Sequence, residues 1–197
     1  MANTVEICNL SLSHIGSSAT VTSISPPDGS VEAGYCARFF ALARQVLLTS
    51  FEWQFATKRV TLATVTNPSD IYAYAYAIPS DCLKPLRLFK AGGLTETDGA
   101  DFEMENGVIL CSEEGAVLKY TFDQTDTTRW TPEFVSAMSW VLASYLAGPI
   151  IKGSEGANAS TKLLERARME GRAGASSDAN RSSVTHGNQI PSGLAVR

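Results

Sequence analysis

The stretch VEAGYCARFFALARQVLLTSFEWQFATKRVTLA, residues 31–63, contains a change in hydrophobic period. As far as about Phe51, its apolar residues recur every three or four positions, which predicts an amphipathic helix. Ser30 directly precedes this helix and is a favoured N-cap residue. Beyond Phe51, apolar and polar residues alternate, which predicts a strand because successive side chains of a strand point to opposite faces. The stretch therefore predicts a long helix that leads directly into a β region.

Two apolar stripes run side by side along the predicted helix. They consist of Tyr35, Phe39, Leu42 and Val46, and of Cys36, Phe40, Ala43 and Leu47. A face of this width predicts that the helix packs on more than one side. Across the whole chain, the residues that we expect in the core are Phe39, Leu42, Val46, Trp53, Phe55, Phe134, Met138, Trp140 and Leu142.

Two further helices have clear start signals. One is expected over residues 4–15, with Asn3 or Thr4 as its cap and a glycine just after its end. The other begins after Thr131, a cap residue that is followed by proline at the first helical position. This helix is expected to end near residues 148–149, where glycine and proline follow one another.

A fourth, more polar helix is predicted over residues 157–172. Its large apolar residues are Leu163, Leu164 and Met169. The following residues, 173–197, are rich in serine, glycine, asparagine and alanine. Such a composition cannot bury enough apolar surface to fold alone, so we expect an extended tail there.

A strand with two different faces is predicted for YAYAYAIPSDCL, residues 72–83. One face would carry Tyr72, Tyr74 and Tyr76, and the other only alanines. Two interpretations of the tyrosines remain open. They could line a subunit interface, because tyrosine offers contact area at low entropic cost. They could equally form an ordinary sheet face that packs on the helices.

Further short strands are predicted as far as about residue 122, with hairpin turns at residues 106–107 and 113–115. The order helix, helix, strands, helix, helix predicts an α+β fold with four helices in one bundle. The expected parts are a helical bundle at 1–62 and 128–172, an inserted antiparallel β domain at 63–127 and a C-terminal arm at 173–197.

The formal net charge of −4 is unevenly distributed. Residues 1–151 contain nine Lys/Arg and sixteen Asp/Glu, whereas residues 152–197 contain seven Lys/Arg and four Asp/Glu. The acidic balance gives no general signal for nucleic-acid binding. The basic C-terminal part is either a solvated helix with its tail or an arm that docks on an acidic partner.

Targeting signals are not expected in this chain. No stretch is expected to reach the roughly 18 uncharged apolar residues of a membrane span. The first residues, MANTVEICNL, lack the basic start and the apolar run of a signal peptide. We therefore expect synthesis in a cytoplasm and no membrane partner.

The sequence offers no convergent set of catalytic side chains. His14 is expected at the surface or as a cap near the end of the first helix, and His186 lies in the tail. Phosphate-binding and nucleophile-elbow motifs do not occur. The chain has four cysteines, and their spacings match no zinc or redox motif: Cys8, Cys36, Cys82 and Cys111. We interpret them as small buried hydrophobic residues, and we expect no enzyme, metal or cofactor.

Three segments together resemble a known protein family. They are LSHIGSSATVTSI, EAGYCARFFALARQVLLTSFEWQFATKRVTLA and YAYAIPSDCLKPLRL, and the helix at 130–150 is similar as well. In order and spacing they resemble the tail tubular protein A family, the head-to-tail adaptor or connector proteins of tailed bacteriophages. The resemblance covers about residues 5–170. The positions that carry it are Leu12, Ile15 and Gly16, then Trp53, Phe55, Ala56, Arg59 and Leu62, then Tyr76, Pro79, Asp81 and Leu83.

This resemblance implies a structural role in a virion, in its tail or neck. Members of the family form a ring, generally dodecameric, beneath the portal at the capsid vertex. The ring extends the channel for DNA ejection and provides the docking platform for the tail. The implied partners are further copies of the chain, the portal protein, a tail nozzle or tail-tube protein, and passing DNA without sequence-specific binding. The helices would form the connector-type bundle of that family.

The resemblance also gives uses to two of the segments described above. The tyrosines Tyr72, Tyr74 and Tyr76 would lie in the lateral contacts of the ring. C-terminal segments of such adaptors commonly reach the portal, so the basic C-terminal part would dock there. The residues expected to make that contact are Arg166, Arg168, Arg172, Ile190, Pro191, Leu194, Val196 and Arg197.

Three other functions remain open at this point. The chain could be another virion component, such as a head-completion plug or a tail-tube subunit, although tube subunits are mostly β. It could be a non-viral helical module that binds nucleic acid or a peptide, for which the basic C-terminal part is the only support. An enzyme is the least supported alternative, because the sequence supplies no residues for its chemistry.

Overall fold

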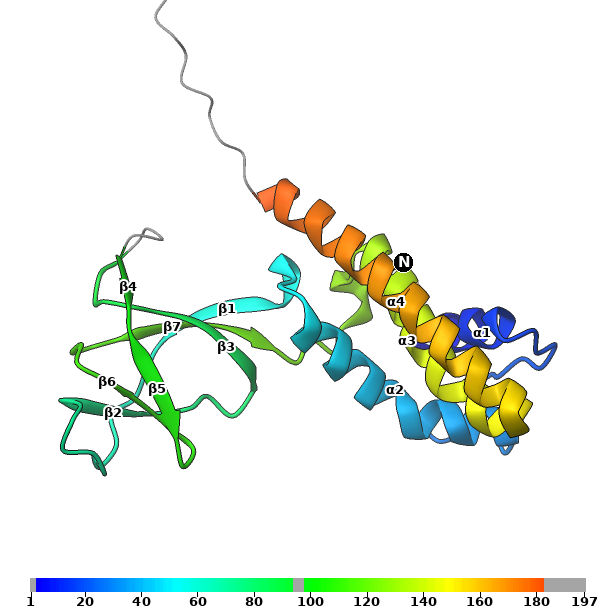
Figure 1. The fold of residues 1–197 in the computed structure, drawn as a ribbon, viewed down its shortest axis with the longest axis horizontal. Coiled ribbons are helices and arrows are strands. Elements are labelled where there is room, and N and C mark those ends of the chain that lie inside the picture. Colours follow the sequence, from blue (N-terminus) through cyan, green and yellow to red (C-terminus); the bar gives the residue numbers. More distant parts are fainter. Residues whose placement is uncertain (1–2, 94–97, 183–197) are drawn as a thin grey trace, which may run out of the picture.

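A computed structural model describes residues 3–93 and 98–182. Figure 1 shows a lobe of helices beside a lobe of strands, and the predicted α+β class is confirmed. The helices are α1 (Thr4–His14), α2 (Val31–Ser50), α3 (Pro132–Ile151) and α4 (Gly153–Ser182), with short 3-10 helices η1 (Gln54–Ala56) and η3 (Thr127–Arg129). The strands are β1 (Thr57–Thr61), β2 (Tyr74–Ala77), β3 (Cys82–Phe89), β4 (Gly99–Ala100), β5 (Phe102–Glu105), β6 (Val108–Cys111) and β7 (Val117–Phe122).

Helix α3 is the centre of the helical lobe, because α1, α2 and α4 all pack against it. The predicted caps are confirmed. Asn3 and Glu6 form a reciprocal capping box at the start of α1. The side chains of Ser30 and Thr131 accept hydrogen bonds from backbone N–H groups in the first turns of α2 and α3.

The buried stripe of α2 is not the one that we expected to form the core. The stripe that is buried consists of Cys36, Phe40, Ala43 and Leu47. Leu42 is 48% exposed, so its expected place in the core is wrong, and Phe39 and Val46 are only partly buried. The reason is that α2 packs on α3 with one face, which leaves the neighbouring stripe at the edge of the contact.

The other expected core residues lie in the helical core. Trp53, Phe134, Met138 and Leu142 are buried, and Phe55 and Trp140 pack against them with partial exposure. The four cysteines are free. Their interpretation as small buried hydrophobic residues is confirmed at three positions and in part at the fourth. Cys8, Cys36 and Cys111 are buried, and Cys82 is partly buried.

Helix α3 continues to Ile151, beyond its expected end, and contains Pro149 in its last turn. By length and composition alone it is also apolar enough to cross a membrane, which the sequence reading did not expect. Within the protein, however, 56% of its apolar 18-residue window is buried. This burial is what the central position of α3 among three other helices requires.

Helix α4 differs most from the prediction. It starts at Gly153 and continues to Ser182, so residues 173–182 belong to a helix and not to an extended tail. Its face toward the protein carries small residues: Gly156, Ala167, Gly171 and Gly174. A Cβ atom on Gly156 would lie 3.0 Å from the carbonyl oxygen of Ala147 in α3. The helix therefore packs through close backbone approach, with few large apolar side chains.

The strands form two antiparallel sheets, in the orders β1-β7-β3-β4 and β2-β6-β5. The chain after β1 leaves the first sheet and pairs with β2, through hydrogen bonds from Val65 N to Ala75 O and from Ala77 N to Ala63 O. On the other side, β4 is followed after one residue by β5. Both sheets are thus joined at two corners, and the strand pairing closes into a small barrel-like lobe.

The interior of this lobe explains the alternating tyrosines. Tyr76 is fully buried, and its hydroxyl donates a 2.7 Å hydrogen bond to the carbonyl of Glu113. Tyr74 is partly buried with its ring centroid 6.3 Å from that of Tyr76, whereas Tyr72 lies before the strand begins. The buried residues around them are Leu62, Leu88, Ile109, Cys111, Ala116, Leu118 and Tyr120. The tyrosine face packs on the opposite sheet and not on the helices, and Tyr76 is not available for a subunit interface.

Candidate functional site

The chain passes from the helical lobe to the β lobe through a buried anchor. Trp53 follows α2, is fully buried, and donates from its indole Nε1 to the carbonyl of Leu47 at 3.1 Å. The next residue, Gln54, begins η1, and its backbone N–H donates to the carboxylate of Asp178. Asp178 lies near the end of α4 and is itself buried. The far end of α4 therefore caps the segment that leads into the β lobe.

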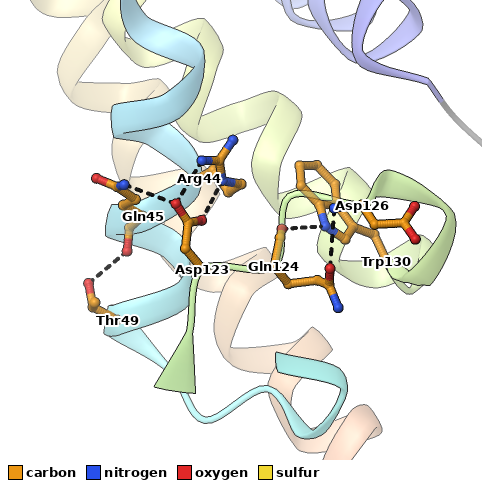
Figure 2. A network of polar contacts seen from close by, with 7 residues as sticks. All are labelled: Arg44, Gln45, Thr49, Asp123, Gln124, Asp126 and Trp130. Carbon is orange, nitrogen blue, oxygen red and sulfur yellow. Dashed lines mark hydrogen bonds and ion pairs between the residues drawn. The ribbon is translucent and has the colours of Figure 1, made fainter. Parts of the chain in front are cut away.

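The return passage is held by an ion pair, which Figure 2 shows from close by. Arg44 of α2 donates from Nε and Nη2 to the two carboxylate oxygens of Asp123, at 2.7 and 2.8 Å. Gln45 donates to the same carboxylate at 3.1 Å. The side chains of Arg44 and Asp123 are 12% and 23% exposed. This bidentate geometry fixes the residue that follows β7 onto the middle of α2.

The environment of Asp123 favours its charged form. Burial by itself raises the pKa of the Asp123 carboxyl, but the hydrogen bonds from Arg44 and Gln45 and the charge of Arg44 outweigh it. The pKa therefore lies below its ordinary value. The contact is consequently strongest when the carboxyl is ionised, above the ordinary pKa range of an aspartate.

A second anchor follows directly along the return passage. The indole Nε1 of Trp130 donates to the carbonyl of Gln124 at 3.0 Å, as seen on the right of Figure 2. The side-chain oxygen of Gln124 accepts from the backbone of Asp126. The Trp130 ring stacks on Phe40 and meets Phe134 edge to face. The loop between β7 and α3 is thereby attached to the helical core.

Two lysines of the β lobe reach the end of α2. Lys84 of β3 donates to the backbone carbonyl of Thr49 at 3.0 Å, and Lys119 of β7 lies 3.9 Å from Glu52. A cation near the last turn of a helix also suits the negative end of the helix dipole. We name the contacts of Arg44–Asp123, Lys84–Thr49 and Trp130–Gln124 the lobe clamp. The lobe clamp sets the orientation of the β lobe relative to α2.

A small apolar groove lies between α2 and α4. Its volume is about 190 Å³. The floor is formed by α3 through Val141 and Tyr145. The remaining lining residues are Val46, Leu47, Ser50, Phe51, Leu164, Ala167 and Arg168. We call this feature the α2–α4 groove.

The three arginines expected to dock on the portal do not form one patch. Arg166 is paired with Glu170 at 2.6 Å, and its guanidinium carbon lies 5.8 Å from the ring centroid of Trp140. Arg168, two residues on, points the other way and lines the α2–α4 groove. Arg172 is exposed. The other expected docking residues, Ile190, Pro191, Leu194, Val196 and Arg197, lie outside the described residues, as does His186.

The remaining histidine takes part in packing. His14 is partly buried, its ring stacks on Trp140 with 3.5 Å between ring centroids, and its Nε2 is 3.0 Å from the hydroxyl of Ser139. Burial lowers its pKa. Among the residues that the structure describes, no group of three His, Cys, Asp or Glu side chains could hold a metal ion.

The β lobe presents one apolar side chain far into solvent. Ile71 is 86% exposed, more than any other large apolar residue in the described part of the chain. It lies in the loop before β2, and its neighbours Asp70 and Tyr72 are exposed and partly exposed. The side chain of Asn67 donates to the carbonyl of Tyr72 at 2.6 Å and shapes this loop.

Sequence reasoning missed the lobe clamp and the α2–α4 groove. In the sequence, Arg44 and Gln45 lie beside the two apolar stripes of the predicted helix and give no sign of their partner. The partner of Arg44 could not be found from local pattern, because 79 residues separate Arg44 from Asp123. The groove depends on the length of α4 and on small residues, which periodicity of large apolar residues does not reveal.

No family model matches this chain, and no curated protein matches its sequence significantly.

Proposed function

We propose that this chain is a structural protein of a tailed-bacteriophage virion, an adaptor that forms a ring beneath the portal. The ring would extend the DNA channel and give the tail its docking platform. The proposed partners are further copies of the chain, the portal protein and a tail nozzle or tail-tube protein. DNA would pass through the ring without sequence-specific contacts.

The observation that supports this proposal is that the three segments resembling the adaptor family meet in one connected framework. Gly16 lies in the first segment, follows the C-cap residue of α1, and turns the chain there with a positive φ of 74°. Trp53 of the second segment is the buried anchor between the lobes. Asp81 of the third accepts hydrogen bonds from Lys58 and from the hydroxyl of Tyr120. The positions that carry the resemblance thus lie within the helical lobe, the β lobe and the passage between them.

The arrangement of helices supports the finer part of the proposal. Helices from both ends of the chain pack around α3, and the β lobe is inserted between them. We propose that these four helices correspond to the connector-type bundle of the adaptor family. The lobe clamp suits a ring subunit, because all copies in a closed ring need the same angle between their lobes.

The experiment that tests this function measures the mass of the complex formed with the portal protein of the phage that encodes the chain. The full chain is compared with a chain that ends at Ser182. This cut leaves α4 complete, whereas a cut after Arg172 would remove packed residues such as Asp178. Mass photometry of the mixtures gives the number of bound copies.

We expect the full chain to add the mass of a ring and the shortened chain to bind at least tenfold more weakly, by about 1.4 kcal/mol or more. Equal binding of both chains would keep the adaptor function and remove the docking role of the C-terminal segment. If neither chain adds mass to the portal, the adaptor function is wrong.

A further inference from the structure

We propose that neighbouring copies of this chain join head to tail, with Ile71 of one copy seated in the α2–α4 groove of the next. This inference rests on the proposed ring. A closed ring needs contacts between two different surfaces of the subunit, because a contact of one patch with itself stops at a dimer. Ile71 and the groove are two such surfaces.

The loop around Ile71 is held in the shape that presents the side chain. The backbone N–H of Ile71 donates to the hydroxyl of Ser69 at 3.1 Å, and the N–H of Ser69 donates to Asn67 at 3.0 Å. Asn67 also holds the carbonyl of Tyr72. A loop that is ordered before contact loses little conformational entropy on binding. An isoleucine that is 86% exposed on such a loop gains most of its burial only from another molecule.

The groove has the size and lining for one aliphatic side chain. Its volume is about 190 Å³, and apolar cavities of about 150 Å³ already accept a benzene molecule. Phe51, Tyr145 and Leu164 supply apolar surface on three sides. Leu42, one turn before Val46 on α2, is 48% exposed and extends the apolar surface along that helix.

The charges beside the two surfaces are complementary. Asp70 precedes Ile71, and Arg168 lies at the rim of the groove. Both side chains are exposed, and within the described ranges neither is in a hydrogen bond or ion pair. Insertion of Ile71 would bring Asp70 next to Arg168, where the pair would fix the register of the contact.

One copy cannot make this contact with itself. Figure 1 places β2 and the loop before it in the β lobe, on the side away from α4. The lobe clamp holds the β lobe to α2 in this orientation. The Ile71 loop and the groove of each copy therefore stay free until they contact other copies. In a closed ring, the last copy contacts the first in the same way.

The test uses cysteine cross-linking of the full chain, which also detects a contact that is weak in solution. In a chain whose partly buried Cys82 is replaced by serine, the variant Ile71→Cys/Ser50→Cys places one accessible thiol on the loop and one at the groove, because the other native cysteines are buried. With a short bis-maleimide linker, we expect a ladder of dimers, trimers and larger species. Each single variant is expected to stop at dimers. Met104→Cys/Ser50→Cys is the matched control, because Met104 is an exposed apolar residue of the same lobe, at 50%.

Charge exchange then tests the register of the contact. In the double-cysteine chain, Arg168→Glu or Asp70→Arg alone is expected to reduce the species larger than dimers about tenfold, which corresponds to about 1.4 kcal/mol. Both exchanges in one chain are expected to restore the ladder. Lys162→Glu, an exchange on another side of α4, is expected to leave it unchanged.

The outcomes separate this inference from the proposed function. A ladder no stronger than that of the Met104 control, or one that the charge exchanges do not change, overturns the contact. If the full chain still adds a ring to the portal, the adaptor function stands and its lateral contact lies elsewhere. If the cross-linked ladder forms but the chain does not bind the portal, the head-to-tail contact is supported and the adaptor function is wrong.

Discussion

Asp178 connects the end of helix α4 to the segment that leads from α2 into the β lobe. Its carboxylate accepts the backbone N–H of Gln54, although 124 residues separate the two in sequence. Trp53, the residue before Gln54, fills the space against Gly174 of the same helix. A residue expected in a flexible tail therefore helps to position the passage into the β lobe.

Replacing Asp178 by alanine is expected to lower the free energy of unfolding by about 1–3 kcal/mol. The change leaves the N–H of Gln54, in a partly buried site, without its acceptor, and an unpaired donor away from water carries this cost. Thermal or urea unfolding measured by circular dichroism checks the effect. Asn180→Ala, an exposed position of the same helix, is the control. Equal stability of both variants would show that the contact does not support the junction.

The sequence predicted caps well because a cap is a local feature. Asn3, Ser30 and Thr131 each bond a backbone group within three residues. Burial of single residues was harder to predict. The alternation that contains Tyr76 correctly predicted a strand, but the elements that cover its tyrosine face depend on pairing between distant strands.

Among the elements, α4 shows most clearly what periodicity leaves out. A pattern of large apolar residues predicted only its middle part, since the buried positions of its inner face are mostly glycine and alanine. Small residues have little hydrophobic signal, and glycine lowers helix propensity. Tertiary packing overcomes both effects here, because close approach brings many backbone and side-chain atoms into contact.

Gly171→Ala is expected to destabilise the protein although alanine is the better helix former. A Cβ at this position would lie 2.6 Å from Cε2 of Phe51, so the ring would have to move. We expect a net loss of about 1–2 kcal/mol in unfolding free energy, the usual cost of overpacking.

The matched control for this glycine is Gly34→Ala in α2. A Cβ there would meet no atom within 4 Å. The substitution is expected to stabilise by about 0.5–1 kcal/mol through helix propensity. Chemical denaturation of both variants gives the comparison. Stabilisation by both would mean that Phe51 gives way freely and that the close packing of α4 has no energetic role.

At the scale of the whole molecule, the lobe clamp makes the relation between the lobes depend on pH. The pKa of Asp123 is lowered in the folded protein, so its contribution to stability is present above the unfolded value of about 3.8. The contribution is lost as the pH falls through the lower folded value. Asp81, whose hydrogen bond from Lys58 lowers its pKa, acts in the same direction within the β lobe.

Asp123→Asn is expected to lower the unfolding free energy at pH 6 by about 1.5–3 kcal/mol, the range for hydrogen bonds to charged groups. The difference from the unmodified chain should shrink as the pH falls below about 4, because protonation removes the same charge. Thermal unfolding between pH 2.5 and 6 measures this convergence. Asp101→Asn, at an exposed position outside the proposed subunit contact, is the control. A difference that stays constant with pH would contradict the assignment.

The order of predicted elements placed the strands between two pairs of helices, although β1 begins before the expected β domain of 63–127. The side-chain contacts that join the two parts could not be predicted, because Arg44 and Asp123 lie far apart in the sequence. The closure of the β lobe into a barrel-like shape could not be predicted from the sequence either. It depends on the single residue between β4 and β5 and on pairing of residues 63–65 with β2.

The pairing of β1 with β7 has a consequence for how proteins with this fold can evolve. Thr57 lies opposite Thr121, so the polypeptide leaves the helical lobe and returns to it at neighbouring points. Insertions whose ends meet are tolerated well, because they neither stretch nor redirect the host chain. Recombination could therefore exchange the whole β lobe for another module as a cassette. The helices would keep their connections while the exchanged module acquired new specificities.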